Sequence, residues 1–524
     1  MKTLKRIVAL GLAVIMILGC AACGSKDKGK VKSDGKTFRI ATVRHSDSNP
    51  TDFLYEGIMQ KLADKHGIKI EWEVYIASDW GEMKTLLFAS PEDLPDAFLG
   101  GLALKDADIQ VYKDLFVELT DYIKKDMPNL SKILEEDNEF KSSMLDADGE
   151  LYSLGKKLPL RPPVHDEPFI NQKWLNNIGM KAPTNYKELE AVLQAFKDED
   201  ADGDGNPNNE IPYTQFGSLK FDARTILAPF GIVVSDAGNY MTMGDDDKPF
   251  FMPTSENYKE AVKWMHNLYQ KGLIDSEYFT QDMSMCTSKI QASGGSQVGL
   301  IYGWTAGSIA GTNEEEFEKM ELLAGPTGNR YAYYEPTYLD MSGVEFVVTK
   351  NCQNVDLLLQ WVDDFYTNEV TMQTFWGSIP NQISDNGDGT YSVLPPTGED
   401  TFDAIAWNNS LRDYGPKYMT EEFEKNIILP TEGGDGQKLA DNINFKYSKA
   451  TFPILKYTRD EYKTLGRYST DINTYVESQY AHWVVDGGVD KEWDEYLSIL
   501  NEMGLKELLK LYDTAYNRYL KSQQ

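Results

Sequence analysis

Histidine and cysteine are scarce in this sequence, which contains five histidines and four cysteines among 524 residues. The histidines are scattered, and none belongs to the H-E-x-x-H pattern that binds zinc in metalloproteases. The sequence also lacks the G-x-S-x-G turn of serine hydrolases and the G-x-x-x-x-G-K-[ST] loop that holds nucleotide phosphates. The sequence therefore gives no support for a zinc metalloprotease, a serine hydrolase or an enzyme with a nucleotide-binding phosphate loop.

Positive charge is also in short supply, with 52 lysines and arginines against 82 aspartates and glutamates. The resulting net charge of −30 repels a phosphate backbone, so we expect no nucleic-acid partner. Hydrophobic residues make up 41% of the chain and charged residues 26%, which is typical of a globular protein. At this length we expect two to three domains with an ample core.

Long hydrophobic runs are missing except at the N-terminus, where Ile7–Ile17 follows Lys2, Lys5 and Arg6. This run is shorter than the roughly 20 apolar residues that a membrane-spanning helix needs. A basic start, an apolar run and then small residues are typical of a secretion signal. The sequence therefore predicts export rather than a membrane-spanning segment.

The two cysteines that follow resemble the lipobox of bacterial lipoproteins, in which the lipidated cysteine becomes the first residue of the mature chain. We favour Cys20 as the anchor, because Ile17 three residues earlier suits a hydrophobic protease pocket. Cys23 is the alternative, and a plain secretory signal with incidental cysteines is the third interpretation. The predicted signal peptide covers 1–22, or ends at residue 19 if Cys20 is the anchor. Acyl chains such as palmitate would hold the protein stably on the extracellular face of the cell membrane.

The start of the body predicts an α/β fold. Residues 24–37 are polar and glycine-rich, as in a flexible linker. Between Phe38 and Gly101 the pattern then reads strand, helix, strand, helix, strand, which predicts a parallel sheet. Ligands of such sheets bind at the carboxyl ends of the strands. Those ends are predicted at 45–47, 77–80 and 100–101.

Several motifs further along resemble a known family. These are FVELTDYI at 116–123, MPNL at 127–130, DGELYSL at 148–154, FINQKWLNNIG at 169–179, APT at 182–184, TDINTY at 470–475 and WDEY at 493–496. Together they resemble the extracellular solute-binding proteins, family 1, of bacterial ABC importers, and within it the alginate-binding and LipO-like oligosaccharide-binding sub-group. The resemblance covers most of the mature chain.

This resemblance implies a two-lobe, periplasmic-binding-protein-like fold of type II, with a hinge between the lobes and a C-terminal helical region. Lobe 1 would comprise 38–160 plus about 335–400, and lobe 2 about 165–325 plus about 430–524. The chain would act as a monomer that captures an extracellular oligosaccharide and delivers it to separate ABC permease subunits. A peptide or a sugar acid is the alternative ligand within this class.

The segment from Asp200 to Pro212 has oxygen-bearing side chains at alternate positions and Gly205 at the sixth, as a Ca²⁺ cage requires. The resembling family also carries a calcium-binding loop of this kind. The predicted ligands are Asp200, Asp202, Asp204, the Asn206 carbonyl, Asn208 and Glu210. Asn209 could replace Glu210, because the loop is one residue longer than the family pattern. An acidic turn without a metal is the alternative, and the expected role of calcium is structural.

Aromatic residues are plentiful, with 10 tryptophans and 30 tyrosines, and their flat faces suit sugar rings. The proposed stacking residues are Trp80, Tyr302, Trp304, Trp376 and Trp407, and the proposed polar residues are Asp47, Asp79, Asp96 and Arg161. Trp304 and Trp80 rank first because each directly follows a predicted strand. We expect no enzyme, although counting carboxylates does not exclude a tethered glycoside hydrolase. Whether Cys286 and Cys352 form a disulfide stays open.

Overall fold

The computed structural model describes residues 34–45, 50–160, 166–235, 238–333, 341–395, 402–430, 443–449 and 451–522. The signal peptide, Cys20, Cys23, Asp47 and Arg161 lie outside these residues, so their predicted roles stay predictions. No helix within the described ranges is long and apolar enough to cross a membrane.

The first lobe is built on a six-stranded sheet with the order β15-β4-β12-β3-β1-β2. Its strands are β1 (Thr37–Arg44), β2 (Lys69–Ile76), β3 (Ala97–Leu99), β4 (Leu154–Lys157), β12 (Met341–Val348) and β15 (Lys417–Tyr418). The first three are parallel and are joined by α2 (Gly57–His66) and α3 (Ala77–Ala89), which confirms the predicted β-α-β-α-β pattern. Apolar residues cover both faces of this sheet.

The predicted loop after the second strand is wrong. Ala77 directly follows β2 and begins α3, so 77–80 form the first helical turn rather than a loop at the strand end. Trp80 turns inward, where its ring lies 4.9 Å from that of Tyr75 and its indole donates to the Ala103 carbonyl. Trp80, which we expected to face a ligand, therefore lies on the apolar, core-facing side of α3.

The second lobe contains a four-stranded sheet with the order β10-β5-β9-β6. Its strands are β5 (Glu167–Asn171), β6 (Ile211–Tyr213), β9 (Val298–Gly303) and β10 (Phe317–Lys319). Two amphipathic helices, α9 (Tyr186–Asp198) and α11 (Glu256–Gln270), bury their apolar residues in the same core. Ser255 accepts the Tyr258 N–H at the start of α11, as a helix cap does.

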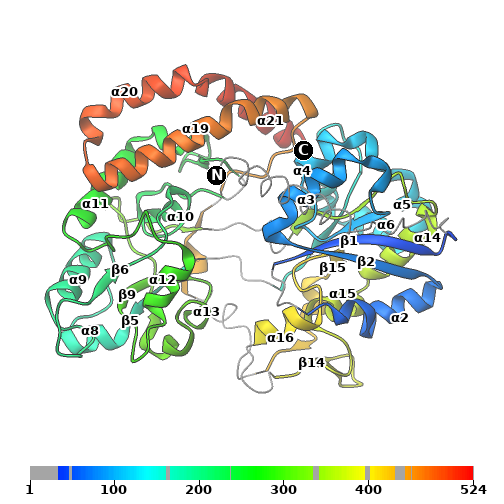
Figure 1. Ribbon diagram of the computed structural model, residues 1–524, viewed down its shortest axis with the longest axis horizontal. Helices are drawn as coiled ribbons and strands as arrows, with labels where there is room; N and C mark the ends of the chain where they lie inside the picture. The colour runs from blue at the N-terminus through cyan, green and yellow to red at the C-terminus, as the bar shows by residue number, and fades with distance from the viewer. Residues whose placement is uncertain are drawn as a thin grey trace, which may run out of the picture.

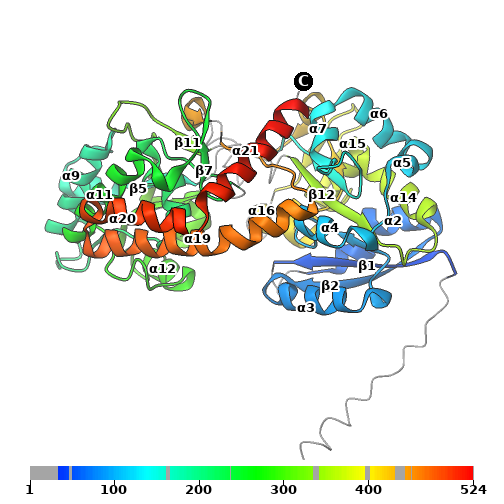
Figure 2. The ribbon, with the colours of Figure 1, turned by 90° about the horizontal axis from the view of Figure 1, so that it is seen from above.

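Three helices complete the C-terminal region, as the resemblance implies: α19 (Arg459–Asp486), α20 (Val489–Glu502) and α21 (Leu505–Ser522). Their apolar faces join the core of the second lobe through Tyr480, Leu500 and Tyr512. The N-terminal part of α19 extends toward α4 (Asp106–Val111) of the first lobe, as Figure 2 shows. Lys456, just before α19, forms an ion pair with Asp106 at 2.6 Å. This region therefore contacts both lobes.

The two lobes lie side by side, and the chain passes between them more than once (Figure 1). β15 belongs to the first sheet, so that lobe includes residues beyond the predicted limit near 400. With this extension the lobe boundaries remain our proposal. Cys286 and Cys352 are both buried free thiols in different apolar clusters, so they do not form a disulfide.

Candidate functional site

Three aromatic side chains meet at the carboxyl end of β1. His45 follows this strand, and its ring centroid lies 5.3 Å from that of Trp407 and 5.6 Å from that of Tyr414. A hydrogen bond of 2.9 Å joins the Tyr414 hydroxyl to His45 Nε2. Burial, with help from the charge of Arg44, lowers the pKa of His45, which favours the neutral imidazole. We call His45, Trp407 and Tyr414 the aromatic wall.

The aromatic wall combines flat faces with polar atoms. Trp407, on α16 (Phe402–Asn409), is half-buried, and the imidazole of His45 is exposed. A neutral imidazole offers one donor and one acceptor, and the Tyr414 hydroxyl can serve as either. This is the chemistry that binds a sugar ring by stacking and its hydroxyls by hydrogen bonds.

A second group lies at one end of the sheet in the other lobe. Glu167 of β5 pairs with Gly303 of β9, so Asp166 and Trp304 lie next to each other at this end. Asp166 forms an ion pair with Arg224, whose guanidinium lies 5.0 Å from the ring centre of Tyr333. Trp304 is half-buried. Aromatic and polar groups are therefore combined here as well.

Figure 1 relates the two groups. β1 runs toward the second lobe, and its carboxyl end lies on the side facing that lobe. In the other lobe, α13 (Ala306–Ala310), which follows Trp304, lies on the side facing the first. The carboxyl end of β1 and helix α13 therefore lie on the sides of the lobes that face each other.

Three of the predicted stacking residues lie in apolar cores. Trp80 is 5% exposed, and Trp376 and Tyr302 are each 2% exposed. Tyr302 packs edge-to-face against Tyr213, and Trp376 packs against Phe375. A ring enclosed in this way has no free face for a sugar, so we withdraw these three as stacking residues. Trp304 and Trp407 remain.

The two described polar candidates do not join the aromatic wall. Asp96 precedes β3 and accepts the Arg39 N–H at 2.7 Å, so it lies at the amino end of the sheet, away from His45. Asp79 is exposed in the first turn of α3, where its neighbour Ser78 donates to it. We therefore withdraw Asp96 and Asp79 as ligand-binding residues.

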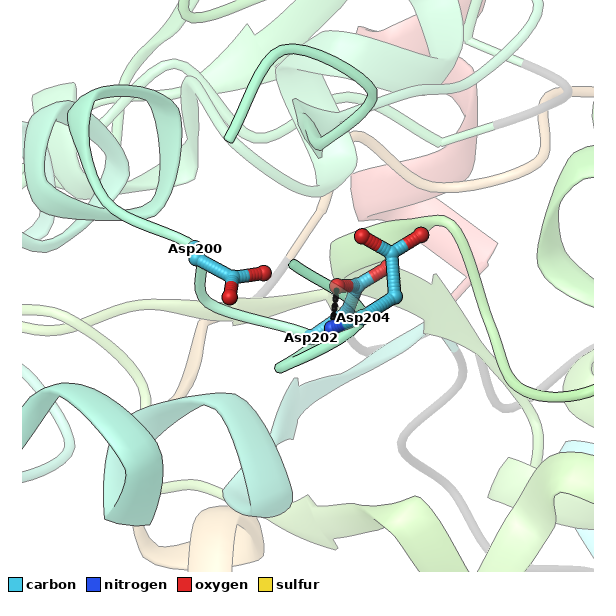
Figure 3. A group of neighbouring side chains, drawn as sticks. All are labelled: Asp200, Asp202 and Asp204. Carbon is cyan, nitrogen blue, oxygen red and sulfur yellow. Dashed lines mark hydrogen bonds between the residues drawn. The ribbon is translucent and has the colours of Figure 1, made fainter. Parts of the chain in front are cut away.

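The acidic loop brings three predicted calcium ligands together (Figure 3). Carboxylate oxygens of Asp200, Asp202 and Asp204 lie within 4.8 Å of one another. Main-chain N–H groups turn the loop around them: Asp200 accepts from Gly205, Asp202 from Asp204, and Asp204 from Asn206. Gly205 has a φ of 91°, which only glycine adopts without strain. The sequence thus folds locally as a cation-binding loop requires.

Two buried oxygen atoms at the end of this loop accept no hydrogen bond. Glu210 accepts the Ala201 N–H through Oε1, whereas its Oε2 is buried without a hydrogen-bond partner. The Oδ1 atom of Asn209 is also buried without a partner. Buried acceptors without donors are costly, and a bound cation would satisfy them. The clustered carboxylate and amide oxygens are the donors that a hard divalent cation takes.

Sequence reasoning placed His45 at the first strand end without selecting it as a binding residue, could not show whether Arg224 joins a site, and missed Tyr414 and Tyr333. His45 follows a strand directly, so the strand-end rule that selected Asp47 could also have selected it. Tyr414 carries no such signal, because it lies 369 residues from His45 along the chain. Arg224 and Tyr333 meet only through the fold of the second lobe.

No protein-family model matches this chain. A curated relative, the fructooligosaccharide ABC transporter substrate-binding protein FusA of Streptococcus pneumoniae, is 29% identical over 99% of this chain and 98% of its own length. Lipoprotein LipO of Bacillus subtilis is 26% identical and covers 98% of both chains.

Solved structures agree with these relatives. FusA of S. pneumoniae in complex with kestose is 28% identical, covers 93% of this chain and 100% of its own, and superposes with a TM-score of 0.79. A FusA EF-hand mutant in complex with fructo-nystose is 27% identical, covers the same shares and has a TM-score of 0.79. The alginate-binding protein AlgQ2, at 19% identity, 92% and 98% coverage and a TM-score of 0.70, shares the fold.

Proposed function

We propose that this chain, a homologue of the substrate-binding proteins of ABC transporters, captures an extracellular oligosaccharide between its two lobes and delivers it to a membrane permease. The predicted resemblance, the two-lobe α/β fold and the carbohydrate-binding role are confirmed by its homology to FusA, and the match to LipO covers the same length of chain. These homologues are substrate-binding proteins rather than enzymes, so we assign no catalytic residue.

The aromatic wall is the observation that carries the proposed site. The half-buried ring of Trp407 offers a stacking face and His45 supplies a polar atom beside it, while Tyr414, only 5% exposed, holds His45 in place through its hydroxyl. Trp304 precedes α13, which lies on the facing side of the second lobe, and we propose that closure of the lobes brings Trp304 toward the same ligand. Such closure removes water from both surfaces and places a sugar between them.

A neutral oligosaccharide fits these groups better than an anionic one. Arg224, the cation near Trp304, already pairs with Asp166 at 3.4 Å. The guanidinium of Arg44, behind the aromatic wall, is 4% exposed and so does not reach the surface as a ligand contact. Since FusA is named for fructooligosaccharides and has been solved with kestose, short neutral fructans are the first ligands to test.

We further propose that calcium occupies the 200–210 loop. Asp200, Asp202, Asp204, Asn206, Asn208 and Glu210 are the proposed ligands, with Asn209 as an additional donor because its buried oxygen has no partner. The cation would neutralise the clustered carboxylates and fix the loop. The role is structural, and the EF-hand mutant studied in FusA supports a related loop in that protein.

The remaining proposals concern the location of the chain. LipO is named a lipoprotein, which supports a lipid anchor at Cys20, or at Cys23, and a position on the extracellular face of the membrane. The permease subunits would be separate chains, and the receptor would act as a monomer. Mass spectrometry of the mature N-terminus would identify the anchoring cysteine.

A titration calorimetry series tests the ligand. Kestose, an oligouronate and a short peptide are each titrated into the folded protein. Binding of kestose with micromolar affinity or better supports the proposal, whereas binding of the peptide or the oligouronate alone overturns it. Release of reducing sugars during the incubation would reveal a hydrolase instead.

A further inference from the structure

Residues 407–417 carry two of the three aromatic-wall residues and lead into β15, and we call them the return segment. Between the end of α16 and the start of β15 this segment has no regular secondary structure. Its main-chain carbonyls therefore need partners other than the ladder of a helix or a sheet. Three buried cations from the first lobe supply them.

Arg44, the last residue of β1, binds the beginning of the segment. Its Nη2 donates to the Trp407 carbonyl at 2.6 Å and its Nη1 to the Ser410 carbonyl at 3.5 Å. The guanidinium also lies 5.9 Å from the centre of the Trp407 ring. One side chain thus contacts both the backbone and the ring of Trp407. It directly precedes His45, the residue that Trp407 must meet.

Two lysines bind the other end. Lys156 of β4 donates to the Asp413 carbonyl, and Lys417 of β15 donates to the Tyr414 carbonyl. Glu345 of β12 accepts the Gly415 N–H at 2.8 Å and lies 3.7 Å from the Lys156 ammonium. Charged groups therefore bind the carbonyl before Tyr414, the carbonyl of Tyr414 itself and the N–H after it. Lys156 and Glu345 come from neighbouring strands, and Lys417 from the end of the segment itself.

Burial makes these contacts costly. Lys156 is 1% exposed and Lys417 is fully buried, so both ammonium groups have lost their water. Burial and the charge of Lys156 lower the pKa of Lys417, while the carboxylates of Glu345 and Asp413 act in the opposite direction. Apolar residues of similar volume often stabilise a protein more than such buried charges do. A contribution to stability therefore does not explain why Lys156 and Lys417 are buried here. A fixed orientation of the return segment does explain it.

We propose that Arg44, Lys156 and Lys417 are positioning residues for saccharide binding, which hold the return segment by its carbonyls so that Trp407 and Tyr414 meet His45. This inference rests on the proposed function, since it assigns the orientation of the same site. None of the three cations needs to touch the ligand. Their effect on affinity comes from a wall that is already in its binding geometry before the ligand arrives.

The main test replaces Lys417 with methionine, which keeps the volume and removes the charge. Because the buried carboxylates of Glu345 and Asp413 lose a counter-charge, we expect the Lys417→Met variant to melt at a lower temperature than the parent. Measured well below that temperature, where it is folded, it should bind kestose about tenfold more weakly. Lys157→Met is the matched control, because Lys157 lies in β4 but pairs with Asp137 and Glu139 instead. Unchanged kestose affinity of the folded Lys417→Met variant, or an equal loss of affinity in Lys157→Met, would overturn the inference.

Arg44→Lys is a second variant. It keeps the positive charge but loses the pair of hydrogen bonds to the Trp407 and Ser410 carbonyls. The expected loss of kestose affinity should disappear in a Trp407→Ala background, because Arg44 acts through that ring. Arg39→Lys, also in β1 and paired with Glu73, is the control. Equal losses in both backgrounds would mean that Arg44 acts by another route and would overturn its assignment.

A ligand-free measurement separates this inference from the proposed function. The imidazole resonances of His45 report its contacts with Trp407 and Tyr414 whether or not a sugar binds. We expect Lys417→Met and Arg44→Lys to shift these resonances and the two controls to leave them unchanged. If kestose fails to bind but the shifts occur, the ligand assignment fails and the positioning of the wall stands. Unshifted resonances overturn the positioning itself.

Discussion

Tyr480 donates a hydrogen bond of 2.6 Å to Asp222, which ties the long helix α19 to α10 (Leu219–Arg224) inside the second lobe. Tyr278 donates to the other oxygen of the same carboxyl at 2.5 Å. Asp222 is fully buried, and burial raises its pKa from 3.8 to about 7. A carboxyl group with this pKa carries a proton over part of the physiological pH range.

The raised pKa of Asp222 makes stability depend on pH. Because the folded pKa exceeds the unfolded value, the contribution of this group to stability is complete below pH 3.8 and is lost as the pH rises to about 7. The Asp222→Asn variant is neutral throughout. Its melting temperature relative to the parent should therefore rise between about pH 4 and about pH 7 and stay level above that. Asp494→Asn, an exposed acid on α20, is the control, and a flat difference for Asp222→Asn would contradict the prediction.

Calcium should stabilise the protein through the 200–210 loop. A ligand present at 100 times its dissociation constant adds about 2.7 kcal/mol to the free energy of unfolding. We expect calcium to raise the melting temperature of the parent after chelation, and to have little effect on Asp202→Asn. Asp246→Asn, an exposed acid outside the loop, should respond like the parent. If adding calcium does not change the melting temperature of the parent, the loop is an acidic turn that binds no calcium.

Loss of one stacking face should weaken sugar binding without unfolding the protein. Trp304→Ala and Trp407→Ala are each expected to cost about 1–2 kcal/mol of binding free energy, or roughly 5- to 30-fold in affinity. Trp80→Phe is the matched control, because Trp80 packs in the core of the first lobe. Calorimetry measures the affinities. Unchanged affinity in both alanine variants would place the ligand elsewhere.

The ion pair between Lys456 and Asp106 connects the C-terminal region to the first lobe. We expect Lys456→Ala to change the equilibrium between open and closed lobes, and hence the affinity for sugar, by about threefold to tenfold, although Lys456 need not touch the ligand. Small-angle scattering with and without kestose measures this equilibrium. Lys463→Ala is the control, since Lys463 pairs only with Asp460 on the same helix. Identical scattering and affinity in both variants would exclude a role for the ion pair.

Local patterns were sufficient for much of the fold. The alternating strands and helices between Thr37 and Leu99 follow from short-range periodicity, and so does the turn of the acidic loop at Gly205. The position of Trp80 did not follow, because a helix that begins directly after a strand leaves no sequence signal at the junction. The contact of His45 with Tyr414 depends on a chain reversal that spacing does not encode.

The return segment also determines when the binding surface can form during synthesis. His45 lies near the start of the folded body, and its hydrogen-bond partner follows 369 residues later. Contacts of such high sequence separation form slowly, because a long loop must close before they gain any energy. The first strands of the sheet can pair early, but the edge strand β15 and the ring of Tyr414 can join them only after most of the chain has emerged. The proposed sugar-binding surface therefore forms as one of the last steps of folding.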